Sequence, residues 1–205
     1  MVPDWSAWLP ASCFPTACFC ERVGAGLVRQ PANTWSSLLF LAPAAAILWA
    51  GPRSGPAAAI AGRYAAALTI IGLGSAFFHA SLTMAGQTMD VMGMYLLITL
   101  VIVAAAERRG LIDVGLATRV YWGSNLALLV ALVTIPGARR LVFAALAVAA
   151  VWLEWTGRPR SDPPAARYLL GSVVALGLGF VIWTLDITGT LCVATSPWQG
   201  HAIWH

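Results

Sequence analysis

The sequence predicts an all-α protein, a polytopic transmembrane helix bundle, and three features of its composition support this. Of its 205 residues, 60% are apolar and only 10% are charged, whereas a soluble domain carries about 25% charged residues. The mean hydropathy of +0.79 indicates more apolar surface than one core of this size can bury. All 12 basic residues are arginines spread along the chain, unlike the clustered patches that bind nucleic acid. A cytosolic globular protein, a disordered chain and a nucleic-acid-binding protein are therefore excluded.

Six stretches are long and apolar enough to cross a bilayer, which takes about 20 mostly apolar residues. Helix breakers separate several of them, for example Gly51-Pro52 and Pro136-Gly137. A seventh stretch begins near Pro197, but at about 1.5 Å per residue it is too short to cross before His205. We therefore expect a seven-helix type of bundle whose last helix is truncated in this chain. The six predicted spans are residues 35–50, 57–82, 88–106, 120–135, 141–155 and 168–185.

Residues 1–32 are expected to form a segment at the membrane–water interface on the outer side of the bilayer. Residues 33–205 are expected to form the helix bundle. The first segment is not apolar enough to span, and it lacks the basic start and the cleavage site of a signal peptide. Its aromatic side chains suit an interface, where such residues gather. They are Trp5, Trp8, Phe14 and Phe19.

The arginines predict the orientation, because cytoplasmic loops carry the excess of basic residues. Eight arginines follow the first, third and fifth spans, and four lie on the opposite side. The N-terminus and the start of the seventh stretch are therefore expected outside. A composition rich in Ala, Gly and Arg without Lys suggests GC-rich bacterial coding, so the outer side would be the periplasm. The eight arginines are Arg53, Arg63, Arg108, Arg109, Arg119, Arg158, Arg160 and Arg167.

Strongly polar side chains gather in the same outer half of the predicted membrane region, where each costs a few kcal/mol and needs a reason. The sequence has three histidines: His79 near the end of the second span, and His201 and His205 on the seventh stretch. A spacing of four places His201 and His205 on one face of a helix, where they can share a metal ion. Ser75 and His79 have the same spacing, and Asp90 lies near the start of the third span.

These residue types are typical of a catalytic zinc site. Three neutral imidazoles, from His79, His201 and His205, leave the fourth tetrahedral position open for water, whose pKa zinc lowers to about 7. Asp90 could take the proton from this water and pass it to the leaving group. Ser75 could hydrogen-bond the zinc-bound water or the developing oxyanion. The reaction class would be metal-assisted hydrolysis of an amide or ester in a lipid.

Each residue also has a structural interpretation. His79 alone could be an interhelical hydrogen-bonding residue, and Ser75 could be a small residue that lets helices pack closely. Asp90 could cap a helix at the interface. Glu154 and Asp186 lie close to helix ends and are expected to be hydrated interfacial residues.

One combination of motifs resembles the alkaline ceramidases, which belong to a superfamily of seven-helix membrane hydrolases that includes the adiponectin-type receptors. The segment Gly72–Leu82, followed by Gln87 and Asp90, is similar to the second and third helices of that family. The resemblance extends from Cys20 to His205. Its other matches are Cys20-Glu21, Asn33-Thr34, Trp183-Thr184-Leu185-Asp186, Cys192, and Gln199-Gly200-His201-Ala202-Ile203-Trp204-His205.

The resemblance implies that His79, His201 and His205 bind Zn²⁺ and that Ser75 and Asp90 are catalytic. The implied reaction is hydrolysis of the ceramide amide to a sphingoid base and a fatty acid. The substrate would be a membrane lipid that enters sideways from the bilayer. Neither nucleic acid nor an obligate protein partner is inferred.

The resemblance also concerns the cysteines, Cys13, Cys18, Cys20 and Cys192, all on the predicted outer side where disulfides are permitted. It implies a disulfide between Cys20 and Cys192, while Cys13 and Cys18 could pair with each other or stay free. A thiolate zinc site is the competing interpretation, although Cys18-x-Cys20 has the wrong spacing for a zinc knuckle.

Some members of the family bind calcium near the N-terminus, but we expect no calcium site in this chain. Glu21 is a weak candidate ligand, and Cys18, Val23 and Gln30 stand where carboxylate or amide ligands would be expected. Calcium takes about six to eight oxygen ligands, so one carboxylate is too few.

Two other functions fit parts of the pattern. A non-catalytic, lipid-sensing receptor could keep the same residues without turnover. A haem protein could use His79 with His201 or His205 as axial ligands, but Ser75 and Asp90 would then have no role.

Overall fold

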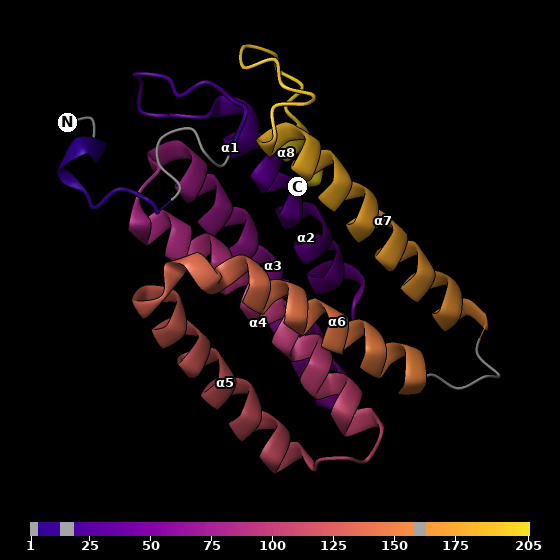
Figure 1. Ribbon diagram of the computed structural model, residues 1–205. Coiled ribbons are helices and arrows are strands. Elements are labelled where there is room, and N and C mark those ends of the chain that lie inside the picture. Colours follow the sequence, from indigo (N-terminus) through magenta and orange to yellow (C-terminus); the bar gives the residue numbers. More distant parts are fainter. Residues whose placement is uncertain (1–3, 13–18, 158–162) are drawn as a thin grey trace. The chain divides into compact units, whose positions relative to one another are not determined.

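The computed structural model describes residues 4–12, 19–157 and 163–205, and within these ranges the chain contains helices and no β-strand (Figure 1). Six helical segments are long and apolar enough to cross a membrane, which confirms the predicted fold class. The elements are η1 (Trp5–Ala7), α1 (Pro31–Ser37), η2 (Leu38–Phe40), α2 (Leu41–Ala50), α3 (Gly55–Ser81), α4 (Met84–Arg108), α5 (Val114–Thr134), η3 (Pro136–Ala138), α6 (Arg139–Gly157), α7 (Pro163–Ile187) and α8 (Gly200–Trp204).

Several helices begin earlier than hydropathy predicts, because the signals that start them are polar or conformational. The first span begins at Pro31, where the fixed φ of proline suits the first helical position. The fourth span begins at Val114, where Asp113 caps α5 by accepting the backbone N–H of Leu116 at 2.8 Å. The seventh stretch forms α8, a helix of 5 residues.

The chain divides into two compact units, residues 1–93 with 178–205, and residues 94–177. In the first unit, α3 packs against α1, η2 and α2, and α8 packs against α1. All three histidines belong to this unit. The second unit contains the later part of α4, helices α5 and α6, and the first part of α7.

Glycines bring α3 and α4 into backbone contact. A Cβ on Gly74 would lie 2.8 Å from the carbonyl carbon of Met89 and 3.0 Å from the backbone nitrogen of Asp90. Gly86 lies equally close to Phe78, and Gly93 to Ile71. Small residues allow membrane helices to approach in this way. The contact at Gly74 places the backbone of Asp90 beside the segment that carries Ser75.

The N-terminal segment is attached to the turn between α3 and α4. The N–H of Ala11 donates to the carbonyl of Leu82 at 3.0 Å, and the N–H of Met84 donates to the carbonyl of Leu9 at 2.8 Å. Leu82 ends α3 with a left-handed φ of 53°, an uncommon conformation for a leucine. These bonds satisfy backbone groups at the end of the helix that carries His79.

Polar contacts in the second unit join its helices. The side-chain N–H₂ of Asn125 donates to the hydroxyl of Thr99 at 2.8 Å, and Arg108 forms an ion pair with Glu154. Glu154 is partly exposed, in agreement with the expected interfacial place.

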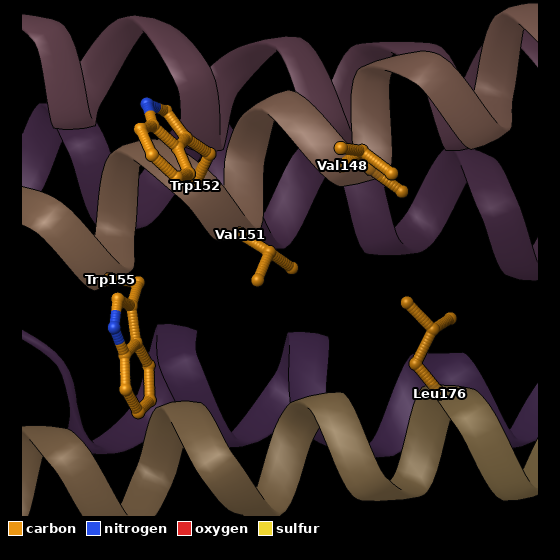
Figure 2. A pocket seen from close by; sticks show the side chains of 6 residues that line it. Val148, Val151, Trp152, Trp155 and Leu176 are labelled. Carbon is orange, nitrogen blue, oxygen red and sulfur yellow. The ribbon is translucent and has the colours of Figure 1, made fainter.

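An apolar groove of about 340 Å³ lies between α6 and α7 in the second unit (Figure 2). No titratable side chain lines it, so it offers apolar contact and no chemistry. Its lining residues are Ala147, Val148, Val151, Trp152, Trp155 and Leu176.

We expect Gly74→Ala to destabilise the protein by about 1–3 kcal/mol, because a methyl group there overlaps the α4 backbone, which cannot move aside as a flexible side chain can. Thermal unfolding in detergent would measure the effect. Gly123→Ala in α5 is the matched control, since no atom outside the helix lies within 4 Å of its added Cβ. Equal unfolding temperatures for the two variants would contradict the close packing of α3 and α4.

Candidate metal centre

Three imidazoles from two helical segments meet in the first unit. His79 lies on α3, His201 on α8, and His205 directly follows α8. One ring nitrogen from each histidine can be chosen so that all three lie within 4.8 Å of one another. The Nε2 atoms of His79 and His201 are 3.0 Å apart. His79 and His201 are buried and His205 is half-buried, so bulk water has little access to the three nitrogens.

Hydroxyl groups surround the ring of His205. Ser36 Oγ lies 2.8 Å from its Nδ1, and Ser75 Oγ lies 3.4 Å from its Nε2. Ser37 Oγ donates to the carbonyl of Asn33 at 2.6 Å and lies 3.1 Å from Ser75 Oγ. The buried hydroxyl of Ser75 therefore lies beside the histidine cluster.

Asp90 lies inside α4, six residues after Met84, so the alternative that it caps this helix is wrong. Its backbone nitrogen approaches Gly74, the residue before Ser75. Among the described residues, the group that could share one metal ion contains the three histidines and does not include Asp90. The structure thus places Asp90 on the neighbouring helix, next to the segment that bears Ser75.

The donor set fits a zinc ion. Zn²⁺ binds histidine nitrogen at about 2.0–2.1 Å, so ligand nitrogens of a tetrahedral site lie roughly 3.4 Å apart. The 3.0 Å separation of His79 and His201 is close to this value, and the chosen nitrogen of His205 lies within 4.8 Å of the other two. A haem with two of these histidines as axial ligands does not fit, because the His79 and His201 rings are in contact, with centroids 4.8 Å apart, and so are those of His79 and His205 at 5.3 Å.

Comparison with known proteins agrees with this geometry. The family model described as Ceramidase matches residues 19–205. The chain belongs to the ceramidase family. None of the curated proteins searched matched the chain. Membership of the ceramidase family implies hydrolysis of an amide bond in a lipid substrate.

A disulfide joins the N-terminal segment to the loop before α8. Cys20 and Cys192 are bonded, as the ceramidase resemblance implies, with Cα atoms 5.5 Å apart. The bonded Cys20 has no thiolate to offer, so the alternative of a thiolate zinc site at Cys18-x-Cys20 is wrong. Cys13 and Cys18, together with Phe14, lie outside the described residues. The disulfide holds the segment that leads into His201 and His205 against the segment that precedes α1.

Glu21, the weak calcium candidate, is engaged by the backbone. Its two carboxylate oxygens accept the N–H groups of Ala32 at 2.7 Å and Asn33 at 2.9 Å, at the start of α1. A carboxylate at this place satisfies free N–H groups and suits the positive end of the helix dipole. Burial raises the pKa of Glu21, the two N–H donors act in the opposite direction, and the nearby charge of Asp186 raises the pKa further.

The sequence did not predict how three residues would contact the candidate metal centre or the segments around it. Gln30 Oε1 lies 2.9 Å from His79 Nδ1. The ring of Phe19 covers His79 and His201, with centroid distances of 4.7 Å and 4.3 Å. Asp186, expected to be hydrated, is instead buried and accepts the N–H of Cys20 at 3.0 Å.

The signals for these residues in the sequence were weak. Gln30 is a single polar residue before a proline, Phe19 is one aromatic residue among several, and Asp186 lies at a helix end where hydration is the usual expectation. Two of them carried a hint from the resemblance: Asp186 is part of the Trp183–Asp186 motif, and Gln30 stands where a carboxylate or amide ligand would be expected.

The raised pKa of Glu21 predicts the sign of a pH effect. Because the folded state holds this proton more tightly than the unfolded state, Glu21 lowers stability as pH rises from its ordinary pKa through its folded pKa. Glu21→Gln lacks this titration. The unfolding temperature of the wild type relative to Glu21→Gln should therefore fall as pH rises from about 4.5 to 7. A difference that grows in favour of the wild type over this range would show that the two N–H donors outweigh burial.

Proposed function

We propose that this protein is a zinc-dependent amidase of membrane lipids that cleaves ceramide or a related N-acyl sphingolipid. The observation that supports this most strongly is the meeting of buried His79 and His201 with half-buried His205, with the hydroxyl of Ser75 at hydrogen-bonding distance from His205. The family match supplies the lipid amide as the substrate class. His79, His201 and His205 would hold the ion.

Zinc held by three imidazoles would supply a Lewis acid for the amide carbonyl and lower the pKa of a bound water to about 7. The protein residues supply the rest of the chemistry. In this proposal, the Asp90 carboxylate accepts one proton from the attacking water as the oxygen–carbon bond forms. It then gives that proton to the amide nitrogen as the carbon–nitrogen bond breaks. The products are a free sphingoid base and a fatty acid, so the atoms of one amide and one water are conserved.

Ser75 would act on the carbonyl oxygen. Its hydroxyl is buried beside His205, where a donor can stabilise the negative charge that develops on that oxygen. Ser37 Oγ, which donates its own proton to the carbonyl of Asn33, lies 3.1 Å from Ser75 Oγ and helps to hold this hydroxyl beside the cluster. Burial of the group strengthens this interaction, because competing water is excluded.

Asp90→Asn should keep bound zinc and lose about 10²–10⁴-fold in the rate of hydrolysis of a fluorescent ceramide, since an amide cannot carry the proton. Ser75→Ala should lose about 10²–10³-fold, with zinc again retained. Ser172→Ala, an exposed serine on α7, is the matched control for the loss of a hydroxyl. Wild-type turnover by Asp90→Asn would overturn its role as proton shuttle.

Zinc-loaded wild-type protein without turnover on any N-acyl lipid would favour the receptor hypothesis.

His79→Ala and His201→Ala should each remove most of the bound zinc, because two remaining imidazoles make a much weaker site. Elemental analysis of protein purified in detergent gives the zinc per chain. A full equivalent of zinc in both variants would show that the ion binds at another place in the protein.

We further propose that the metal centre faces the outside, which would be the periplasm of a bacterium. The arginine distribution supports this orientation, with eight arginines on one side against four on the other.

Leu27 and Leu111 are both exposed and lie on opposite sides in this orientation, before α1 and between α4 and α5. A membrane-impermeant maleimide should label Leu27→Cys in intact cells, and Leu111→Cys only after permeabilisation. The reverse pattern would invert the orientation.

A further inference from the structure

Gln30 is a buried amide between the N-terminal segment and the histidine cluster. It is 1% exposed. Its Nε2 donates to the backbone carbonyl of Glu21 at 3.1 Å, and its Oε1 lies 2.9 Å from His79 Nδ1. Its own backbone N–H donates to the carbonyl of His79 at 3.1 Å. Gln30 therefore touches His79 through both its backbone and its side chain.

The direction of these hydrogen bonds follows from chemistry. The carbonyl of Glu21 can only accept, so the amide atom of Gln30 that faces it must be the nitrogen. The atom that faces His79 is then the oxygen, which also can only accept. Nδ1 of His79 must therefore carry the proton, and a neutral imidazole with a proton on Nδ1 has its lone pair on Nε2. Nε2 is the atom that faces His201.

We propose that Gln30 is a positioning residue that fixes the tautomer and the ring orientation of His79, so that Nε2 is presented to the metal. This inference rests on the proposed function and adds a residue to it. Metal-binding histidines generally donate their second ring N–H to an acceptor, and loss of that acceptor typically lowers metal affinity about 10–100-fold. In this chain the acceptor is an uncharged amide. It is held in place by Glu21, whose carboxylate is in turn bound to the start of α1.

Two variants of Gln30 separate the bond to His79 from the bond to Glu21. Gln30→Met and Gln30→Glu both lose the N–H₂ donor to the Glu21 carbonyl, but only glutamate keeps an oxygen for His79 Nδ1. Gln87→Met is a control for the loss of a buried glutamine, because Gln87 is equally buried and its oxygen accepts from Ser12 instead.

The measurement is competition for zinc with a calibrated chelator, using the full chain in detergent. We expect Gln30→Met to bind zinc about 10–100-fold more weakly than the wild type, and Gln30→Glu and Gln87→Met to stay within a few-fold of it. Zinc binding by Gln30→Met that equals the wild type would overturn the proposal. Equal weakening in Gln30→Met and Gln30→Glu would also overturn it, because the bond to Glu21 would then be the one that matters.

A second measurement needs no variant that could fail to fold. In metal-free wild-type protein labelled with ¹⁵N-histidine, the nitrogen spectrum should show His79 protonated on Nδ1 and unprotonated on Nε2. The opposite tautomer would mean that Gln30 does not accept from His79, and it would overturn the proposal. Both measurements are independent of hydrolysis, so an error in the assigned substrate or in the role of Asp90 would leave their outcome unchanged.

Discussion

The meeting of His79 with His201 is the contact on which the rest of this site depends. The two rings come from segments 122 residues apart in the sequence, and their Nε2 atoms are only 3.0 Å from each other. Without a metal, two neutral imidazoles at this distance share one hydrogen bond, in which a ring N–H of one donates to the lone pair of the other. A shared cation would give the contact its purpose, because both lone pairs could then point to one charge.

Much of the first unit serves to hold these rings in place. The Cys20–Cys192 disulfide joins the segment before α1 to the loop before α8, and the ring of Phe19 packs against both imidazoles. Glu21 anchors the start of α1, from which Ser36 and Ser37 reach His205. In a membrane protein, buried polar groups need partners within the protein, and here each of these polar partners also orients a candidate ligand or a neighbour of one.

The sequence predicted the six long helices and the proximity of the three histidines, and each prediction had a physical basis. Hydropathy over 20 residues is a strong signal, so all six spans were predicted, although the helices begin up to six residues before the predicted starts. The largest difference is at α5, where Asp113 caps the helix. The histidines and Ser75 stood out because a polar residue in hydrocarbon is costly. The burial of Gln30 and Asp186 was not predicted, because they lie at the ends of spans, where polar residues are ordinary. Their burial is decided by the segment of residues 19–30, which has no periodic pattern of its own.

X-ray absorption at the zinc edge of the purified protein would show whether the three imidazoles share one zinc ion. If they do, the spectrum contains nitrogen and oxygen ligands only, at about 2.0–2.1 Å, with the scattering pattern of three imidazole rings. A zinc–sulfur distance of about 2.3 Å, or a spectrum with fewer than three imidazoles on a fully loaded protein, would contradict it.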